Sequence, residues 1–169
     1  MGFESTLTAL LHPTDLRPLT AALCACARRQ LPRAMAQAPY NRVIVETTEA
    51  WLAGTASLAE ISKVLARASN TRGAAFTVAC VRVLVEAAPA REATVRRFAQ
   101  QLPTALWMAS EDGRRWAARV GPAEAVGDDP EAVDGIDAVE SDLCALVQAT
   151  TAQLASAAHD KFPSGSGPH

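Results

Sequence analysis

Alanine is the residue that most constrains what this chain can fold into, because 36 of the 169 residues are alanine. Alanine has the most favourable intrinsic helix propensity, since its side chain loses no entropy in a helix. Apolar residues make up 49% of the chain, yet only eight residues are aromatic. A core of small side chains lets helices approach one another closely. The sequence therefore predicts an all-α fold.

Apolar residues recur at helical spacing along most of the chain, and prolines, glycines and capping residues divide it into segments. The helices expected from this pattern cover residues 3–12, 15–31, 41–53, 57–68, 74–87, 91–102, 104–120 and 135–159. We expect a compact bundle of six to eight helices, with a single domain over residues 1–161 and a disordered tail over residues 162–169. Residues 74–87 are rich in valine and could form a buried strand, although the run is long for one.

Details of this prediction can be checked at particular residues. Trp51, Val64 and Val81 lie on apolar helix faces and are expected to be buried. Pro103 is expected to separate two helices. Residues 121–134 (GPAEAVGDDPEAVD) are expected to form an acidic loop that ends at Asp134, the cap of the last helix.

The sequence also favours a cytoplasmic protein. No stretch approaches the roughly 18 consecutive apolar residues of a membrane span. The N-terminal residues lack the basic segment and the long apolar run of a signal peptide. The four cysteines, Cys24, Cys26, Cys80 and Cys144, form no CxxC motif and no cluster with histidine. We therefore expect buried, reduced thiols rather than a structural zinc site.

Few residues are suited to catalysis. The histidines are His12, His159 and His169, and no nucleophile motif such as G-x-S-x-G accompanies them. The calcium-binding EF-hand pattern, read from Asp129, fails at Val133. A glycine-rich phosphate loop is absent from the sequence. We expect no catalytic residue, no bound metal and no cofactor.

Charge is distributed unevenly along the chain. Residues 1–119 hold 15 basic and 9 acidic side chains, whereas residues 120–169 hold one basic and nine acidic side chains. A concentrated acidic surface attracts a basic partner and speeds association, although a charge run can also be a solvated face. The isoelectric point of about 5.9 argues against nucleic-acid binding. We expect an acidic face that binds a basic protein, formed by Glu124, Asp128, Asp129, Glu131, Asp134, Asp137 and Glu140.

Two other classes of function stay open. The first is a small-molecule-binding protein, or an enzyme of a biosynthetic cluster, with a pocket between helices. Its inward polar residues would be Glu46, Glu49, Arg72 and Arg82. The second is a regulatory or scaffolding domain that acts by forming homo-oligomers.

One stretch of the chain resembles a known family. Residues 26–32 read Cys-Ala-Arg-Arg-Gln-Leu-Pro, and Arg42, Val45-Glu46 and Ala50-Trp-Leu-Ala-Gly54 follow. This pattern, within residues 22–70, resembles bacterial immunity proteins, which are short, helical and rich in alanine and arginine. The resemblance implies a protein that protects a cell by neutralising a toxin, and it brings no catalytic residues. The family continues with repeated Ala-His pairs, whereas this chain has no histidine between residues 13 and 158.

Overall fold

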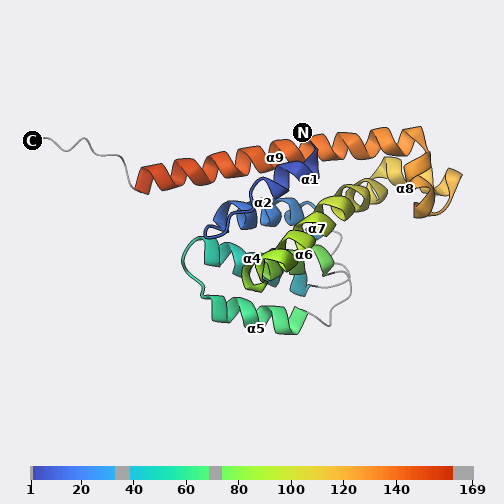
Figure 1. Ribbon diagram of the computed structural model, residues 1–169. Helices are drawn as coiled ribbons and strands as arrows, with labels where there is room; N and C mark the ends of the chain where they lie inside the picture. Colours follow the sequence, from blue (N-terminus) through green and yellow to red (C-terminus); the bar gives the residue numbers. More distant parts are fainter. Residues whose placement is uncertain (1, 33–38, 69–73, 162–169) are drawn as a thin grey trace, which may run out of the picture.

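The computed structural model describes residues 2–32, 39–68 and 74–161, and these form eight α-helices and one 3₁₀ helix, with no strand. The elements, shown in Figure 1, are α1 (Phe3–Thr8), α2 (Arg17–Arg28), α4 (Tyr40–Leu52), α5 (Leu58–Ala68), α6 (Ala75–Val85), α7 (Ala88–Ala109), α8 (Glu111–Val120), η1 (Ala123–Asp128) and α9 (Pro130–Lys161). The all-α prediction is confirmed. The run that could have formed a strand is helix α6. The expected disordered tail lies outside the described residues.

Local sequence signals explain several helix boundaries. Ser57 and Glu60 form a capping box, in which the Ser57 amide donates to Glu60 Oε2 at 2.7 Å and the Glu60 amide donates to Ser57 Oγ at 3.2 Å. Ser110 caps α8 by accepting from the Gly113 amide at 3.1 Å. Gly54 follows α4 with φ of 79°, a conformation that favours glycine.

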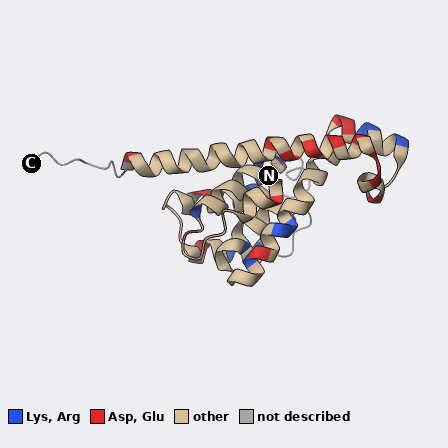
Figure 2. Cartoon of the chain, turned by 45° about the horizontal axis from the view of Figure 1, so that its top comes forward, with Lys and Arg blue, Asp and Glu red and all other residues tan. Residues whose placement is uncertain are grey.

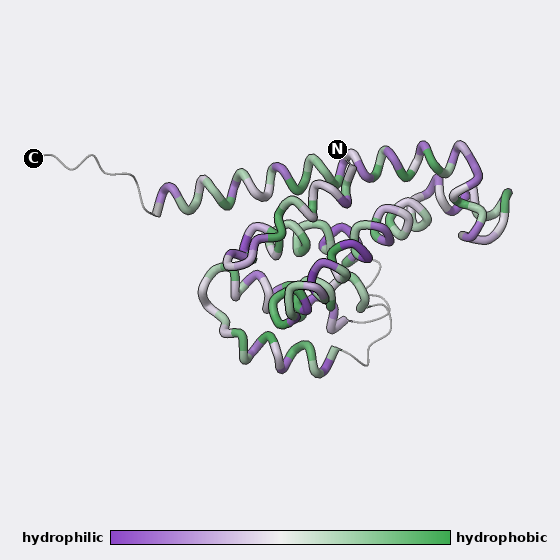
Figure 3. Tube along the Cα trace, viewed as in Figure 1, coloured by the Kyte–Doolittle hydropathy of each residue, from purple (hydrophilic) through white to green (hydrophobic). Residues whose placement is uncertain are grey.

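The main core surrounds α2, which packs against α4, α6 and α9. Leu19, Leu23 and Cys26 recur every three or four residues along α2 and are fully buried. Phe3 and Leu7 of α1 complete this core from the side of α7 and α9. Hydrophobic and hydrophilic residues alternate along α9 in Figure 3, as expected for a helix with one apolar face.

A second core lies between α4, α5 and α6, around Ile44, Ile61 and Val81. Val81 is fully buried, as predicted. The expected burial of Trp51 and Val64 was wrong, because both side chains are only half-buried. Helix α5 packs mainly against α4 and α6 at the edge of the molecule, so solvent reaches the outer sides of this core (Figure 1).

The expected helix boundary at Pro103 was also wrong. Helix α7 continues through Pro103 to Ala109, and the ring of Pro103 is buried. Proline removes one backbone hydrogen bond, but its φ is compatible with a helix, and burial of the ring offsets part of the loss. The boundary lies at Ser110, whose extended backbone both ends α7 and begins α8.

The expected start of the last helix requires a correction too. Helix α9 begins at Pro130 rather than at Gly135, and part of the expected acidic loop is the 3₁₀ helix η1. Asp129, not Asp134, caps α9: its Oδ1 accepts from the amides of Glu131 at 2.9 Å and Ala132 at 3.3 Å. Proline is favoured at the first position of a helix, because its missing N–H needs no partner there. No helix of the described residues has the length and apolar character needed to cross a membrane.

Candidate functional site

A small separate core supports the acidic end of the molecule. It consists of Trp107, Trp116, Val126 and Ala132, which come from α7, α8, η1 and α9, and we name it the tryptophan core. The two indole rings lie 5.5 Å apart at an angle of 60°. Tilted aromatic pairs of this kind add to the stabilisation gained from burial. The tryptophan core therefore fixes η1 and the start of α9 against the rest of the bundle.

Two glycines allow the helices to approach Trp107 closely. A Cβ atom at Gly135 of α9 would lie 2.0 Å from Trp107 Nε1. A Cβ atom at Gly113 of α8 would lie 2.0 Å from the carbonyl oxygen of Trp107. Neither distance is compatible with a side chain, so both contacts depend on glycine.

The predicted acidic residues do not all play the same part. Asp129 caps α9 and is half-buried. Glu131 forms a two-oxygen ion pair with Arg119 of α8, at 2.8 Å and 2.6 Å. Glu140 is half-buried beside a shallow hollow at the N-terminus of α1. These three carboxylates are therefore engaged in the fold or partly covered by it.

The other four predicted acidic residues are exposed. Glu124 and Asp128 lie on η1, and Asp134 and Asp137 lie on the first turns of α9. None of the four has a hydrogen bond or an ion pair to any residue that the structure describes. We name Glu124, Asp128, Asp134 and Asp137 the acidic surface. Figure 2 shows the acidic residues of η1 and α9 gathered at one end, whereas most of the second half of α9 carries no charge.

The predicted pocket residues are not brought together. Glu49 pairs with Arg28 on the surface, with Nε to Oε1 at 2.5 Å, and Glu46 lies within 3.9 Å of Arg42. Both glutamates thus face arginines of α2 and α4 rather than a cavity. Arg72 lies outside the described residues.

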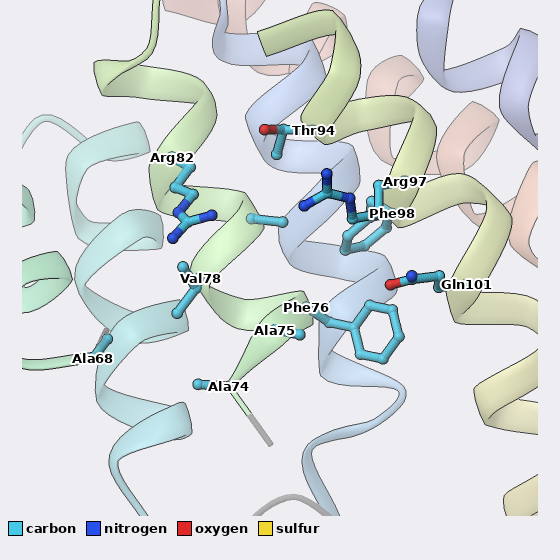
Figure 4. Close-up of a pocket in the computed structure, with 11 residues that line it drawn as sticks. Ala68, Ala74, Ala75, Phe76, Val78, Arg82, Thr94, Arg97, Phe98 and Gln101 are labelled. Carbon is cyan, nitrogen blue, oxygen red and sulfur yellow. The ribbon is translucent and has the colours of Figure 1, made fainter. Parts of the chain in front are cut away.

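Arg82 does line a cavity, but with different neighbours. The cavity has a volume of about 310 Å³ and lies mainly between α6 and α7. Figure 4 shows the labelled side chains that surround it. Its polar side chains are Arg82, Thr94, Arg97 and Gln101, and its aromatic side chains are Phe76 and Phe98.

A sequence pattern could have identified these residues. The cavity is lined by Ala75, Val78, Ala79 and Arg82 of α6, and by Thr94, Arg97, Phe98 and Gln101 of α7. Each set follows the spacing i, i+3, i+4, i+7, which is that of one helix face. An arginine within an otherwise apolar stripe was the available signal. Which two stripes face each other depends on tertiary packing, and the sequence does not state it.

The thiols lie in the main core and are not joined by disulfides. Cys24, Cys26 and Cys80 are buried and Cys144 is half-buried, and all four are free. Burial raises the pKa of Cys26 to about 12. A hydrogen bond with Cys24, together with burial, raises the pKa of Cys80 well above its usual value. The thiols of Cys26 and Cys80 are therefore uncharged at neutral pH and poorly suited to act as nucleophiles.

The histidines offer no catalytic geometry in the described part of the chain. His12 Nδ1 accepts from the amides of Thr14 at 3.2 Å and Asp15 at 3.0 Å, so it organises the turn before α2. His159 is exposed near the end of α9, and His169 lies outside the described residues. Residues 2–32, 39–68 and 74–161 contain no group of three or more His, Cys, Asp or Glu side chains placed to hold a metal ion.

Comparisons of the chain with protein-family models, with curated proteins and with solved structures find no match.

Proposed function

We propose that this chain is a non-catalytic binding protein that docks a basic protein partner on its acidic surface and neutralises that partner by covering it. The observation that carries the proposal is the set of four exposed carboxylates on η1 and α9 that have no partner among the described residues. Unpaired surface charge of one sign raises the rate of encounter with a partner of the opposite sign.

The rigidity of this end supports the same function. The tryptophan core holds η1 and α9 in place, and Gly135 lets α9 lie directly against Trp107. Binding at this surface does not require a mobile loop to become ordered. Such ordering would cost free energy and weaken the binding of the partner. The Arg119–Glu131 ion pair further joins α8 to the start of α9.

The resemblance of residues 22–70 to immunity proteins adds a biological setting, in which the basic partner is a toxin. The helices that the structure describes within this stretch are parts of α2, α4 and α5, and in Figure 1 α4 and α5 lie well apart from η1. The acidic surface would then capture the toxin, and the remainder of the bundle would serve as its scaffold.

The experiment uses two full-length variants with the same loss of charge. The first replaces Asp128, Asp134 and Asp137 with asparagine. The control replaces Glu46 and Glu92 with glutamine and Asp160 with asparagine, since these exposed carboxylates lie elsewhere. Partners are captured from the source cell with the wild-type chain, identified by mass spectrometry and purified. Association rates are then measured at several salt concentrations.

The acidic-surface variant is expected to associate with the partner on the order of ten times more slowly at low salt, and to lose most of the salt dependence. The control is expected to behave like the wild type. Equal association rates for the two variants, or a captured partner that is acidic, would remove the basis of the proposal.

A further inference from the structure

The cavity between α6 and α7 is bordered by two arginines that no described carboxylate neutralises. Arg82 of α6 and Arg97 of α7 both line it, and Figure 4 shows the Arg97 side chain extending from α7 toward α6. Within residues 2–32, 39–68 and 74–161, neither side chain takes part in a hydrogen bond or an ion pair. Two like charges on one cavity repel each other, and a bound anion would relieve that repulsion.

Most other arginines on the described helices have a hydrogen-bond or ion-pair partner, unlike Arg82 and Arg97. Arg28 and Arg119 each pair with a glutamate, at 2.5 Å and 2.6 Å. Arg17 donates to the carbonyl oxygen of Leu52 at 2.6 Å. Arg67 of α5 is exposed and forms no side-chain hydrogen bond or ion pair with the described residues, but it does not line the cavity. Arg82 and Arg97 therefore differ from the other arginines in having two features together: they have no partner among the described residues, and they line the same cavity.

The remainder of the cavity wall is apolar and aromatic. Phe76 and Phe98 meet edge to face, with ring centroids 5.8 Å apart and an angle of 83°. Small side chains such as Ala75 and Ala79 leave the space between the two helices unfilled. Gln101 adds a neutral amide at the side of Phe98. A ligand that fills this space needs an apolar body as well as a negative charge.

The connection between α6 and α7 holds this geometry in place. Arg91 donates from Nε to the carbonyl oxygen of Val83 at 2.7 Å, and from Nη2 to the carbonyl oxygen of Glu86 at 2.9 Å. The Glu86 carboxylate accepts from Oγ1 of Thr94, a cavity-lining residue of α7, at 2.7 Å, and it forms no ion pair with Arg82 or Arg97. The cavity is therefore preformed, as most small-molecule sites are.

We propose that this cavity binds a small organic anion, with a carboxylate or phosphate group on the two arginines and an aromatic or branched apolar body against Phe76 and Phe98. The planar guanidinium group matches the two oxygens of either head group. The volume of about 310 Å³ suits a molecule with a single ring. The site lies on α6 and α7 and the acidic surface lies on η1 and α9, so either function can fail without the other.

The test is a calorimetric titration of the full-length chain with four probes: benzoate, phenyl phosphate, benzyl alcohol and inorganic phosphate. We expect the two aromatic anions to bind at least about tenfold more tightly than either the neutral alcohol or inorganic phosphate, because only they satisfy both parts of the site. The order of benzoate and phenyl phosphate identifies the preferred head group. Saturation by none of the probes in the millimolar range, or equal binding of the alcohol, would overturn the proposal.

Variants separate the site from general attraction to basic residues. Arg82→Gln and Arg97→Gln are each expected to weaken the tighter aromatic anion by about tenfold, the size of one charge-assisted hydrogen bond. Both side chains are exposed, so the variants should keep the wild-type melting temperature. Arg67→Gln is the matched control and should bind as the wild type does. Equal weakening by Arg67→Gln and Arg97→Gln would show non-specific attraction and overturn the proposal.

Discussion

The acidic surface and the cavity between α6 and α7 are two charged regions that differ in shape. At the acidic surface, η1 and the first turns of α9 cover the tryptophan core, and the four carboxylates of the acidic surface are exposed on these two elements. Within the bundle, by contrast, Arg82 and Arg97 border a cavity between faces of α6 and α7. An outward surface of charge suits a large partner, whereas a cavity with charges at its border suits a small ligand. Charges without a described ion-pair partner thus occur in two different settings, on an outward surface and at the border of a cavity.

The separation of charge along the sequence survives in the fold. Glu131 is the one acidic residue beyond position 120 that forms an ion pair within the described chain, and its partner is Arg119. The remaining ion pairs join residues of the first 119 positions to one another. Folding therefore leaves most of the acidic excess without an ion pair in the described part of the chain.

The largest effect is expected at the acidic end, from Trp116→Ala. Trp116 is fully buried in the tryptophan core, and truncation of a buried aromatic side chain costs about 3–5 kcal/mol of unfolding free energy. Its Nε1 has no partner among the described residues, so removal of this donor offsets part of the loss and favours the lower half of that range. Urea unfolding followed by circular dichroism measures the change.

Val120→Ala is the control for this experiment, because Val120 is 44% exposed at the end of the same helix. It should cost less than about 1 kcal/mol. A loss as small as that for Trp116→Ala would mean that the acidic end is not firmly packed, and the contrast between the two regions would disappear.

The second prediction tests how closely α9 approaches Trp107. Gly135→Ala places a methyl group where the indole now lies, and overpacking of this kind costs about 1–3 kcal/mol. Gly127→Ala in η1 is the matched control, since a Cβ atom there would meet nothing within 4 Å. Thermal unfolding of both variants decides the matter: equal melting temperatures would contradict the contact between α9 and Trp107.

The sequence was sufficient for the fold class because helix propensity and apolar periodicity act locally and agree with each other here. It was insufficient where tertiary packing decides. Burial of the Pro103 ring keeps α7 continuous, although the local rule places a boundary there. Asp129 and Asp134 are both plausible caps, and the proline that follows Asp129 was the stronger signal. The cavity could not be predicted, because its position depends on which face of α7 packs next to Arg82, and local sequence patterns do not determine that packing.

The third prediction concerns the second core, which borders the cavity. Trp51 is half-buried beside the second core, so Trp51→Ala should cost about 1–2 kcal/mol, less than Trp116→Ala. The two variants are compared under the same urea conditions. A cost of about 3–5 kcal/mol would place Trp51 in a closed core and would mean that α5 covers this region more fully than the structure has it.

The smallest effect separates two neighbouring carboxylates at the acidic end. Asp129→Ala removes the cap of α9 and should cost about 1 kcal/mol, whereas Asp128→Ala removes an exposed carboxylate without a described partner and should change stability by less than about 0.5 kcal/mol. Asp128 belongs to the acidic surface, whereas Asp129 is half-buried and bonded to two amides, so Asp128→Ala should slow association with a basic partner more than Asp129→Ala does. Stability and association rate therefore respond differently to the same change in charge. If Asp128→Ala destabilised the fold as much as Asp129→Ala, the carboxylate of Asp128 would be engaged in the fold, and the acidic surface would lose one of its four members.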